Sequence, residues 1–98
     1  MSPLSDQTQE NLTSFIDGGL EMADDFLEDA VVHLQLRHFL FAGESLQNAL
    51  QAMDLVERYL PAVAEHDQLR RYQANVSTAR ERVHVLEQSM TREGTRSY

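Results

Sequence analysis

The most constraining feature of this sequence is a regular apolar seam in its last third. Successive seam residues are alternately three and four positions apart, and the residues between them are almost all polar. This spacing puts one narrow row of side chains on one face of an α-helix, so it predicts a helix from about Asp67 to Met90 with Asp67 as N-cap. Such a seam is typical of a helix that packs lengthwise against one or two others. The seam residues are Leu69, Tyr72, Val76, Ala79, Val83, Leu86 and Met90.

A second apolar stripe occupies the first third of the chain and crosses Gly18-Gly19. Ser5 or Asp6 is expected to cap the start of this helix. Each glycine costs a helix interior about 1 kcal/mol relative to alanine, so we predict a break or kink near Gly18. The unbroken stripe is also compatible with a bend or a point of close packing. Its residues are Leu12, Ile16, Leu20, Ala23, Leu27, Val31 and Leu34.

Residues 31–37 can be interpreted as a strand or as a helix. Val32, Leu34 and Leu36 alternate with polar residues, but the chain contains no second alternating run that could pair with them. An unpaired strand leaves backbone groups unsatisfied, so we favour a central helix that continues to Phe41 and ends at Ala42-Gly43, where glycine can take the left-handed conformation.

A third helix is predicted between this glycine and Pro61, which stops it because the residue before a proline is pushed out of the α region. Asp54 and Arg58 would form an i,i+4 pair on its outer side. Its inner face comprises Leu46, Ala49, Leu50, Met53, Val56 and Leu60.

Part of this helix resembles the second helix of a tetratricopeptide repeat, through Ala49, Met53, Val56 and Pro61. Residues 33–41 would then be the first helix of the repeat, although Arg37 stands where that pattern has a glycine. One repeat cannot bury a solenoid core, so the resemblance implies a helical hairpin and not membership of the family.

These patterns predict an all-α fold, a small three- to four-helix bundle with a long C-terminal helix. At 98 residues the chain forms one domain, residues 1–98, in which we expect 1–7 and 91–98 to be flexible. A chain of this size buries only about two thirds of its unfolded surface, so we expect homodimerisation to complete the core. The expected partner or dimer contacts are Leu69, Tyr72, Val76, Val83, Leu86, Met90, Phe39 and Phe41.

Charge is distributed unevenly along the chain. The net charge is −8, and residues 1–36 carry eight acids and no Arg or Lys, whereas residues 67–98 carry six arginines. This gradient suggests that the acidic first segment lies near the arginine-bearing last one, within a chain or between two. The net charge repels phosphate backbones, which argues against nucleic-acid binding.

The composition also narrows the location and the chemistry. There is no cysteine, which excludes disulfides and thiolate sites, and no apolar run approaches the roughly 20 residues that span a bilayer. The first ten residues lack the charged and apolar regions of a signal peptide, so we expect a cytoplasmic protein without membrane contact.

Two acid–histidine pairs have spacings that could bring metal ligands together on a helix. Glu81 and His84 have the E-x-x-H spacing of ferritin-like di-iron sites, and a dimer could add Glu21, Asp25 or Glu28. Both residues are out of phase with the inward seam, so we interpret them as surface residues. Asp29 and His33, at i,i+4, provide only half of a site. No metal site or cofactor is therefore predicted.

The sequence also contains no recognisable set of catalytic residues. His38 lies on the apolar stripe, where a lone histidine is more often a core or interface residue than a base or ligand. A histidine phosphotransfer role requires a lysine after the histidine, and Phe41 occupies that position in a chain without lysine. No phosphate-binding glycine loop is present. We therefore expect no enzymatic activity.

The leading hypothesis is a non-enzymatic interaction module, such as an adaptor, a secretion-type chaperone or a regulator, that binds another protein through an apolar helix groove. One alternative is an acidic inhibitor or immunity-type protein that occupies a basic site on its partner. A further alternative is a dimeric ferritin-like metal protein. The acidic docking patch of the inhibitor hypothesis comprises Asp24, Asp25, Glu28 and Asp29.

Overall fold

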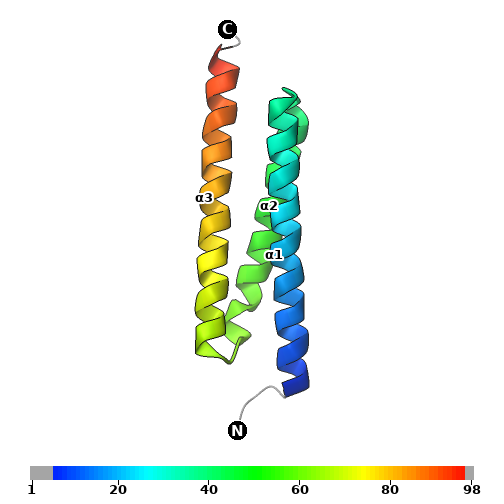
Figure 1. Cartoon of the computed structure of the whole chain (residues 1–98), viewed down its shortest axis with the longest axis vertical. Helices are drawn as coiled ribbons and strands as arrows, with labels where there is room; N and C mark the ends of the chain where they lie inside the picture. Colours follow the sequence, from blue (N-terminus) through cyan, green and yellow to red (C-terminus); the bar gives the residue numbers. More distant parts are fainter. Residues whose placement is uncertain (1–5, 97–98) are drawn as a thin grey trace.

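The computed structural model describes residues 6–96, which form three α-helices and a short 3₁₀ turn, with no strand among them (Figure 1). The elements are α1 (Asp6–Gln35), α2 (Phe39–Tyr59), η1 (Leu60–Ala62) and α3 (His66–Arg96). Helices α1 and α2 form an antiparallel hairpin, and α3 stands beside it (Figure 1). The molecule is a rod of 61 × 17 × 15 Å, and the all-α class predicted from the sequence is confirmed.

Helix α1 passes through Gly18-Gly19 without interruption, so the predicted break near Gly18 is wrong. A Cβ atom added at Gly19 would lie 2.6 Å from Cγ2 of Val56, whereas one added at Gly18 would meet nothing within 4 Å. Gly19 is therefore a point of close approach between the backbone of α1 and the side chain of Val56 in α2. Alanines that line the hairpin, among them Ala23 and Ala49, are fully buried and allow the same close approach.

The hairpin turns at residues 36–38, not at the predicted Ala42-Gly43. Arg37 has a φ of 62°, and the amides of Arg37 and His38 donate to the carbonyls of Leu34 and His33 at 3.0 and 2.8 Å. These two bonds form a Schellman motif, the usual end of a helix whose C′ residue is left-handed. Gly43 lies inside α2, where an added Cβ atom would make an ordinary van der Waals contact with Met90 at 3.6 Å.

The position of this turn shows whether residues 31–37 form a strand or a helix. Residues 31–35 are the last turn of α1, so the helical interpretation is confirmed up to Gln35. The helix does not continue to Phe41, because the chain reverses at Arg37. Residues 33–41 are consequently not the first helix of a tetratricopeptide-like pair, although α1 and α2 do form a helical hairpin (Figure 1).

Helix α2 ends at Tyr59, and Pro61 is part of the 3₁₀ turn that follows, as its position predicted. The chain then runs without regular structure over residues 63–65 before α3 begins. The side chain of Gln9 holds this connection against α1, donating to the carbonyl of Ala62 and accepting from the amide of Ala64, both at 3.0 Å.

Helix α3 begins at His66 and continues to Arg96, six residues beyond the predicted end at Met90. Asp67 lies in its first turn and is not the N-cap. Regular helix thus extends into both segments that we expected to be flexible, 1–7 and 91–98, while residues 1–5 (with the proposed cap Ser5) and 97–98 lie outside the described residues. Flexibility of these segments stays a prediction.

The core has two clusters. One lies toward the hairpin turn and contains Leu27, Met53 and Val83, and the other lies toward η1 and contains Ile16, Val56 and Tyr72. All seven seam residues of α3 are in these clusters or packed against them, so the prediction that the seam faces inward is confirmed.

Polar contacts attach α3 to both helices of the hairpin. Arg82 pairs with Asp24 of α1 at 2.6 Å, and Arg80 pairs with Asp54 and Glu57 of α2, each at 2.8 Å. The acidic first segment therefore lies beside the arginine-bearing last one within a single chain, as the charge gradient suggested. Asp54, predicted to pair with Arg58, instead reaches across to α3.

Candidate interaction surfaces

The structure divides the predicted contact residues between the core and the surface. Tyr72, Val76 and Val83 are buried inside the chain's own bundle. Phe39 is half-buried at the start of α2, whereas Phe41 is exposed. The other half-buried members of the set, all on α3, are Leu69, Leu86 and Met90. In this fold the seam builds the core of the single chain, and Phe41 is the member of the set that is exposed.

The four residues of the predicted acidic docking patch do not share one face. Asp24 points toward α3, where it pairs with Arg82. Asp25, Glu28 and Asp29 are exposed, and at 100° per residue they spread over more than a quarter of the helix circumference. Asp25 and Asp29 lie on the side of α1 that is turned away from α3, which separates them from Asp24.

The acid–histidine pairs are on the outside of the bundle. Glu81 and His84 are exposed on α3, which agrees with their interpretation as surface residues. Within residues 6–96, no three His, Asp or Glu side chains come close enough to hold one metal ion. Glu21 lines a groove between α1 and α3 together with Asp24, which is already paired.

Three rings gather at the hairpin turn. The ring centroids of His33 and His38 are 6.0 Å apart, and that of Phe41 lies 5.6 Å from His33 and 6.1 Å from His38. Nδ1 of His33 is buried, and none of the described residues offers it a hydrogen bond. His38 is exposed, contrary to a place on the buried stripe, because α1 ends three residues before it.

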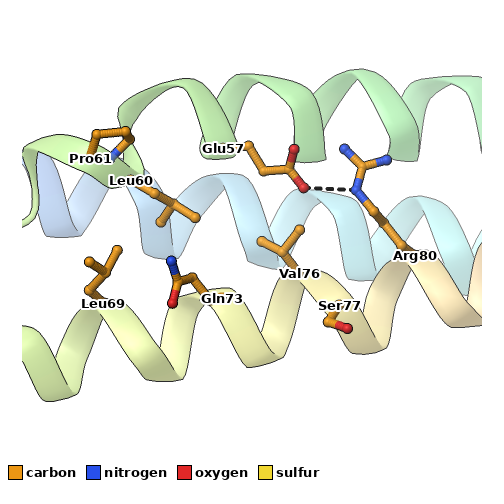
Figure 2. A pocket seen from close by; sticks show the side chains of 8 residues that line it. All are labelled: Glu57, Leu60, Pro61, Leu69, Gln73, Val76, Ser77 and Arg80. Atoms are coloured by element: carbon orange, nitrogen blue, oxygen red, sulfur yellow. Dashed lines mark hydrogen bonds and ion pairs between the residues drawn. The ribbon is translucent and has the colours of Figure 1, made fainter.

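A groove of about 560 Å³ separates the end of α2 from the first half of α3 (Figure 2). Leu60 and Pro61 form one wall and Leu69 and Val76 the other, with the polar side chains of Gln73 and Ser77 along the α3 side (Figure 2).

Arg80 closes one end of this α2–α3 groove. The carboxylates of Glu57 and Asp54 raise the pKa of its guanidinium, chiefly through hydrogen bonds. The guanidinium is thus neutralised within the chain, and the groove offers an apolar floor without a free charge from Arg80 to orient a ligand.

The largest set of exposed apolar side chains lies elsewhere, on the side of the α1–α2 hairpin that is turned away from α3. On α1, Asp24 points to α3, and Met22 lies about 160° away from it around the helix axis. On α2, Glu57 points to α3, and Leu55 lies about 160° away from it in the same way. Met22 and Leu55 are therefore both turned away from α3. We call this surface the hairpin face. Its large apolar residues, each between 40% and 54% exposed, are Phe15, Met22, Phe41, Leu55 and Tyr59.

Contacts between the two helices show that these residues belong to one surface. The rings of Phe15 and Tyr59 meet edge to face with centroids 5.2 Å apart at one end, and His33 contacts Phe41 at the other. Between these ends, Ala52 is nearly buried and Phe26 half-buried, and the exposed Asn48 adds one polar side chain on α2.

Sequence reasoning missed four of these residues: Phe15, Met22, Leu55 and Tyr59. They lie beside the main apolar stripes, not on them. A signal was present, because Phe15 and Met22 are seven residues apart, as are Phe41, Asn48 and Leu55. Such a repeat next to a core stripe indicates a second packing surface on the same helix.

Comparison of the chain with protein-family models, with curated proteins and with solved structures found no match. None of the helices in residues 6–96 is both long and apolar enough to cross a bilayer.

Proposed function

We propose that this protein is a non-enzymatic helical interaction module that binds another protein through the hairpin face. The observation that carries the proposal is the alignment of five large, roughly half-exposed apolar side chains along one side of two packed helices. Contiguous apolar surface of this kind is unfavourable in water, and in soluble proteins it commonly marks an interaction site.

The shape of the face supports the same function. Helix α3 packs along one side of the antiparallel α1–α2 hairpin (Figure 1), and the hairpin face lies opposite it. On the other side the place of a further helix is open. A partner helix laid there would cover Phe15, Met22 and Leu55 as α3 covers the opposite side, which is the usual helix-in-groove mode of recognition.

Three single substitutions test the proposal. Met22→Ser and Leu55→Ser each remove an apolar side chain from the hairpin face. Val85→Ser is the matched control, because Val85 is 55% exposed but lies on the side of α3 that is turned away from the hairpin. All three positions are exposed, so each variant should unfold within about 0.5 kcal/mol of the wild type.

Proteins captured from native cells by the wild type and by the three variants are quantified by mass spectrometry, and the affinity of the best candidate is then measured with purified protein. We expect Met22→Ser and Leu55→Ser to weaken binding about tenfold or more, and Val85→Ser to leave it unchanged. A partner that binds all four proteins equally would contradict the proposal.

Homodimerisation remains a prediction. The same purified proteins provide its test by size-exclusion chromatography with light scattering. Because the seam residues Tyr72, Val76 and Val83 are buried within one chain, a dimer that keeps this fold would have to use another surface. A dimer that Leu55→Ser dissociates would identify the hairpin face as that surface.

A further inference from the structure

The hairpin face is bordered by charged residues, and their signs indicate which kind of partner is complementary to it. We propose that the hairpin face binds a cationic amphipathic helix of the partner protein, an inference that rests on the proposed function above. This helix lies along the hairpin, with its basic residues over the end of the face next to the α1–α2 turn. The proposal follows from the length of the face, from the position of its charges and from the net charge of the chain.

The length of the face suits one helix. From Phe15 to His33 the α1 side rises about 27 Å at 1.5 Å per residue, so a guest helix of about 18 residues, or five turns, covers it. On the α2 side Phe41, Asn48 and Leu55 recur every seven residues. A guest that packs along this repeat presents its own apolar residues at positions i, i+3 or i+4, and i+7.

The charges along the border of the face are not symmetric. Around the half nearest the turn stand three exposed acids, Asp25 and Asp29 from α1 and Glu44 from α2, and one exposed arginine, Arg37, in the turn itself. Around the other half stands Arg58. A guest helix with arginines or lysines over the first half and none over the second half is therefore complementary, and this arrangement also determines its direction along the groove.

The arginines of α3 do not neutralise this border. Arg80 is bound to Asp54 and Glu57, and Arg82 is bound to Asp24. Both sets of ion pairs lie on the α3 side of the hairpin, so neither reaches Asp25, Asp29 or Glu44. Residues 6–35 contain no arginine or lysine at all.

The same charges argue against a second copy of this chain as the occupant. A two-fold axis along the hairpin would bring the acidic half against itself, and an axis across the hairpin would set its three acids against one arginine, Arg58 of the other copy. Each copy also carries a net charge of −8, which adds long-range repulsion. A cationic partner would instead be attracted both by the acidic half of the face and by the net negative charge of the chain.

The test uses synthetic peptides of about 18 residues with a fluorescent label, read by anisotropy. The first has leucines at the amphipathic spacing and arginines beside them in one half. The second replaces the arginines with glutamine, and the third is a scrambled sequence of the first. The proteins are the wild type, Leu55→Ser, Val85→Ser, the pair Asp25→Asn with Asp29→Asn, and a charge-matched control pair, Glu10→Gln with Glu81→Gln.

We expect the first peptide to bind the wild type, Val85→Ser and the control pair with the same affinity. Leu55→Ser should weaken it about tenfold or more, and the Asp25 and Asp29 pair about fivefold to tenfold. Raising the salt from about 0.05 to about 0.5 M should weaken binding to the wild type more than binding to the Asp25 and Asp29 pair.

Several results would overturn this inference, and they separate it from the proposed function. If the glutamine peptide binds as tightly as the arginine peptide and only Leu55→Ser weakens it, the face binds a helix that need not be cationic, and the proposed function stands. If light scattering shows a dimer that Leu55→Ser dissociates, a second copy is the occupant, and the face is still the interaction site. If Leu55→Ser binds every peptide as the wild type does, or if the scrambled peptide binds equally well, both proposals fail. Absence of binding by the first peptide, weaker than a Kd of about 1 mM, also overturns the inference.

Discussion

Gly19→Ala is the substitution that tests the packing of the hairpin most directly. The Cβ atom it adds would lie 2.6 Å from Cγ2 of Val56, about 1 Å inside ordinary van der Waals contact. Val56 is fully buried, and a β-branched side chain in a helix has one strongly preferred rotamer, so it cannot turn away easily. Either the two helices move apart near this point or Val56 is forced out of its rotamer.

The expected magnitude is the difference between two opposing effects. Overfilling a well-packed core costs typically about 1–3 kcal/mol, whereas replacing a helical glycine with alanine stabilises by about 1 kcal/mol. We therefore expect Gly19→Ala to destabilise the protein by about 1 kcal/mol. Gly18→Ala is the matched control, because nothing lies within 4 Å of its added Cβ, and it should stabilise by about 0.5–1 kcal/mol.

Urea unfolding followed by circular dichroism at the helical band measures both free energies. Two neighbouring substitutions of the same chemistry should differ in sign and by about 2 kcal/mol, or roughly 10 °C in Tm for a domain of this size. Val56→Ala should restore room, so the double variant Gly19→Ala with Val56→Ala should be more stable than the sum of the single effects predicts, by about 1 kcal/mol or more. If Gly19→Ala stabilises as much as Gly18→Ala, α1 and α2 do not approach at this position and the hairpin packing described here is wrong.

Two further predictions concern the turn and the core. Arg37→Gly should be more stable to urea than Arg37→Ala by about 1 kcal/mol, because both lose the side chain but only alanine keeps the strain of a Cβ at a φ of 62°; equal stabilities would mean that Arg37 is not left-handed in solution. Burial and the neighbouring Asp17 carboxylate raise the pKa of Tyr72 to about 12, above the value of about 10 in an unfolded chain. Above pH ~10 the unfolded state therefore loses a proton that the folded state keeps, so the free energy of unfolding should fall by up to about 1.4 kcal/mol per pH unit until pH ~12, a fall that Tyr72→Phe should lack; parallel pH profiles for the two proteins would refute the shift.

Much of the fold could be read from apolar spacing, because that spacing reports local backbone geometry. The seam from Leu69 to Met90 indicated a long helix and the face that it buries, and both are confirmed. Pro61 marked the end of α2, although Leu60 before it keeps α-helical dihedral angles, with φ −56° and ψ −41°, and the helix tightens into the 3₁₀ turn. The charge gradient indicated which segments are adjacent, and the Arg82–Asp24 pair shows that they meet within one chain.

Two of the predictions that failed concern places where two helices act on each other. The glycine rule put a break at Gly18 and a turn at Gly43, yet the chain continues through both and reverses at Arg37. A glycine costs a helix about 1 kcal/mol, which is less than burying large apolar side chains such as those of Leu27 and Val56 contributes. A left-handed arginine costs a similar amount, so the apolar pairing between α1 and α2 decides where the chain turns.

The candidate site could be predicted only in part for the same reason. Periodicity showed that Tyr72, Val76 and Val83 are buried, but it could not distinguish burial in the chain's own core from burial against a partner. Phe15, Met22 and Leu55 form a surface only because α3 covers one side of the hairpin and leaves the other side open.

The sequence by itself therefore determined which segments are helical and which face of each is apolar, because both depend on neighbours within a few residues. Tertiary structure decided where the chain turns, which glycine is a close contact and which apolar face remains for a partner, because each depends on contact energies between residues distant in the sequence.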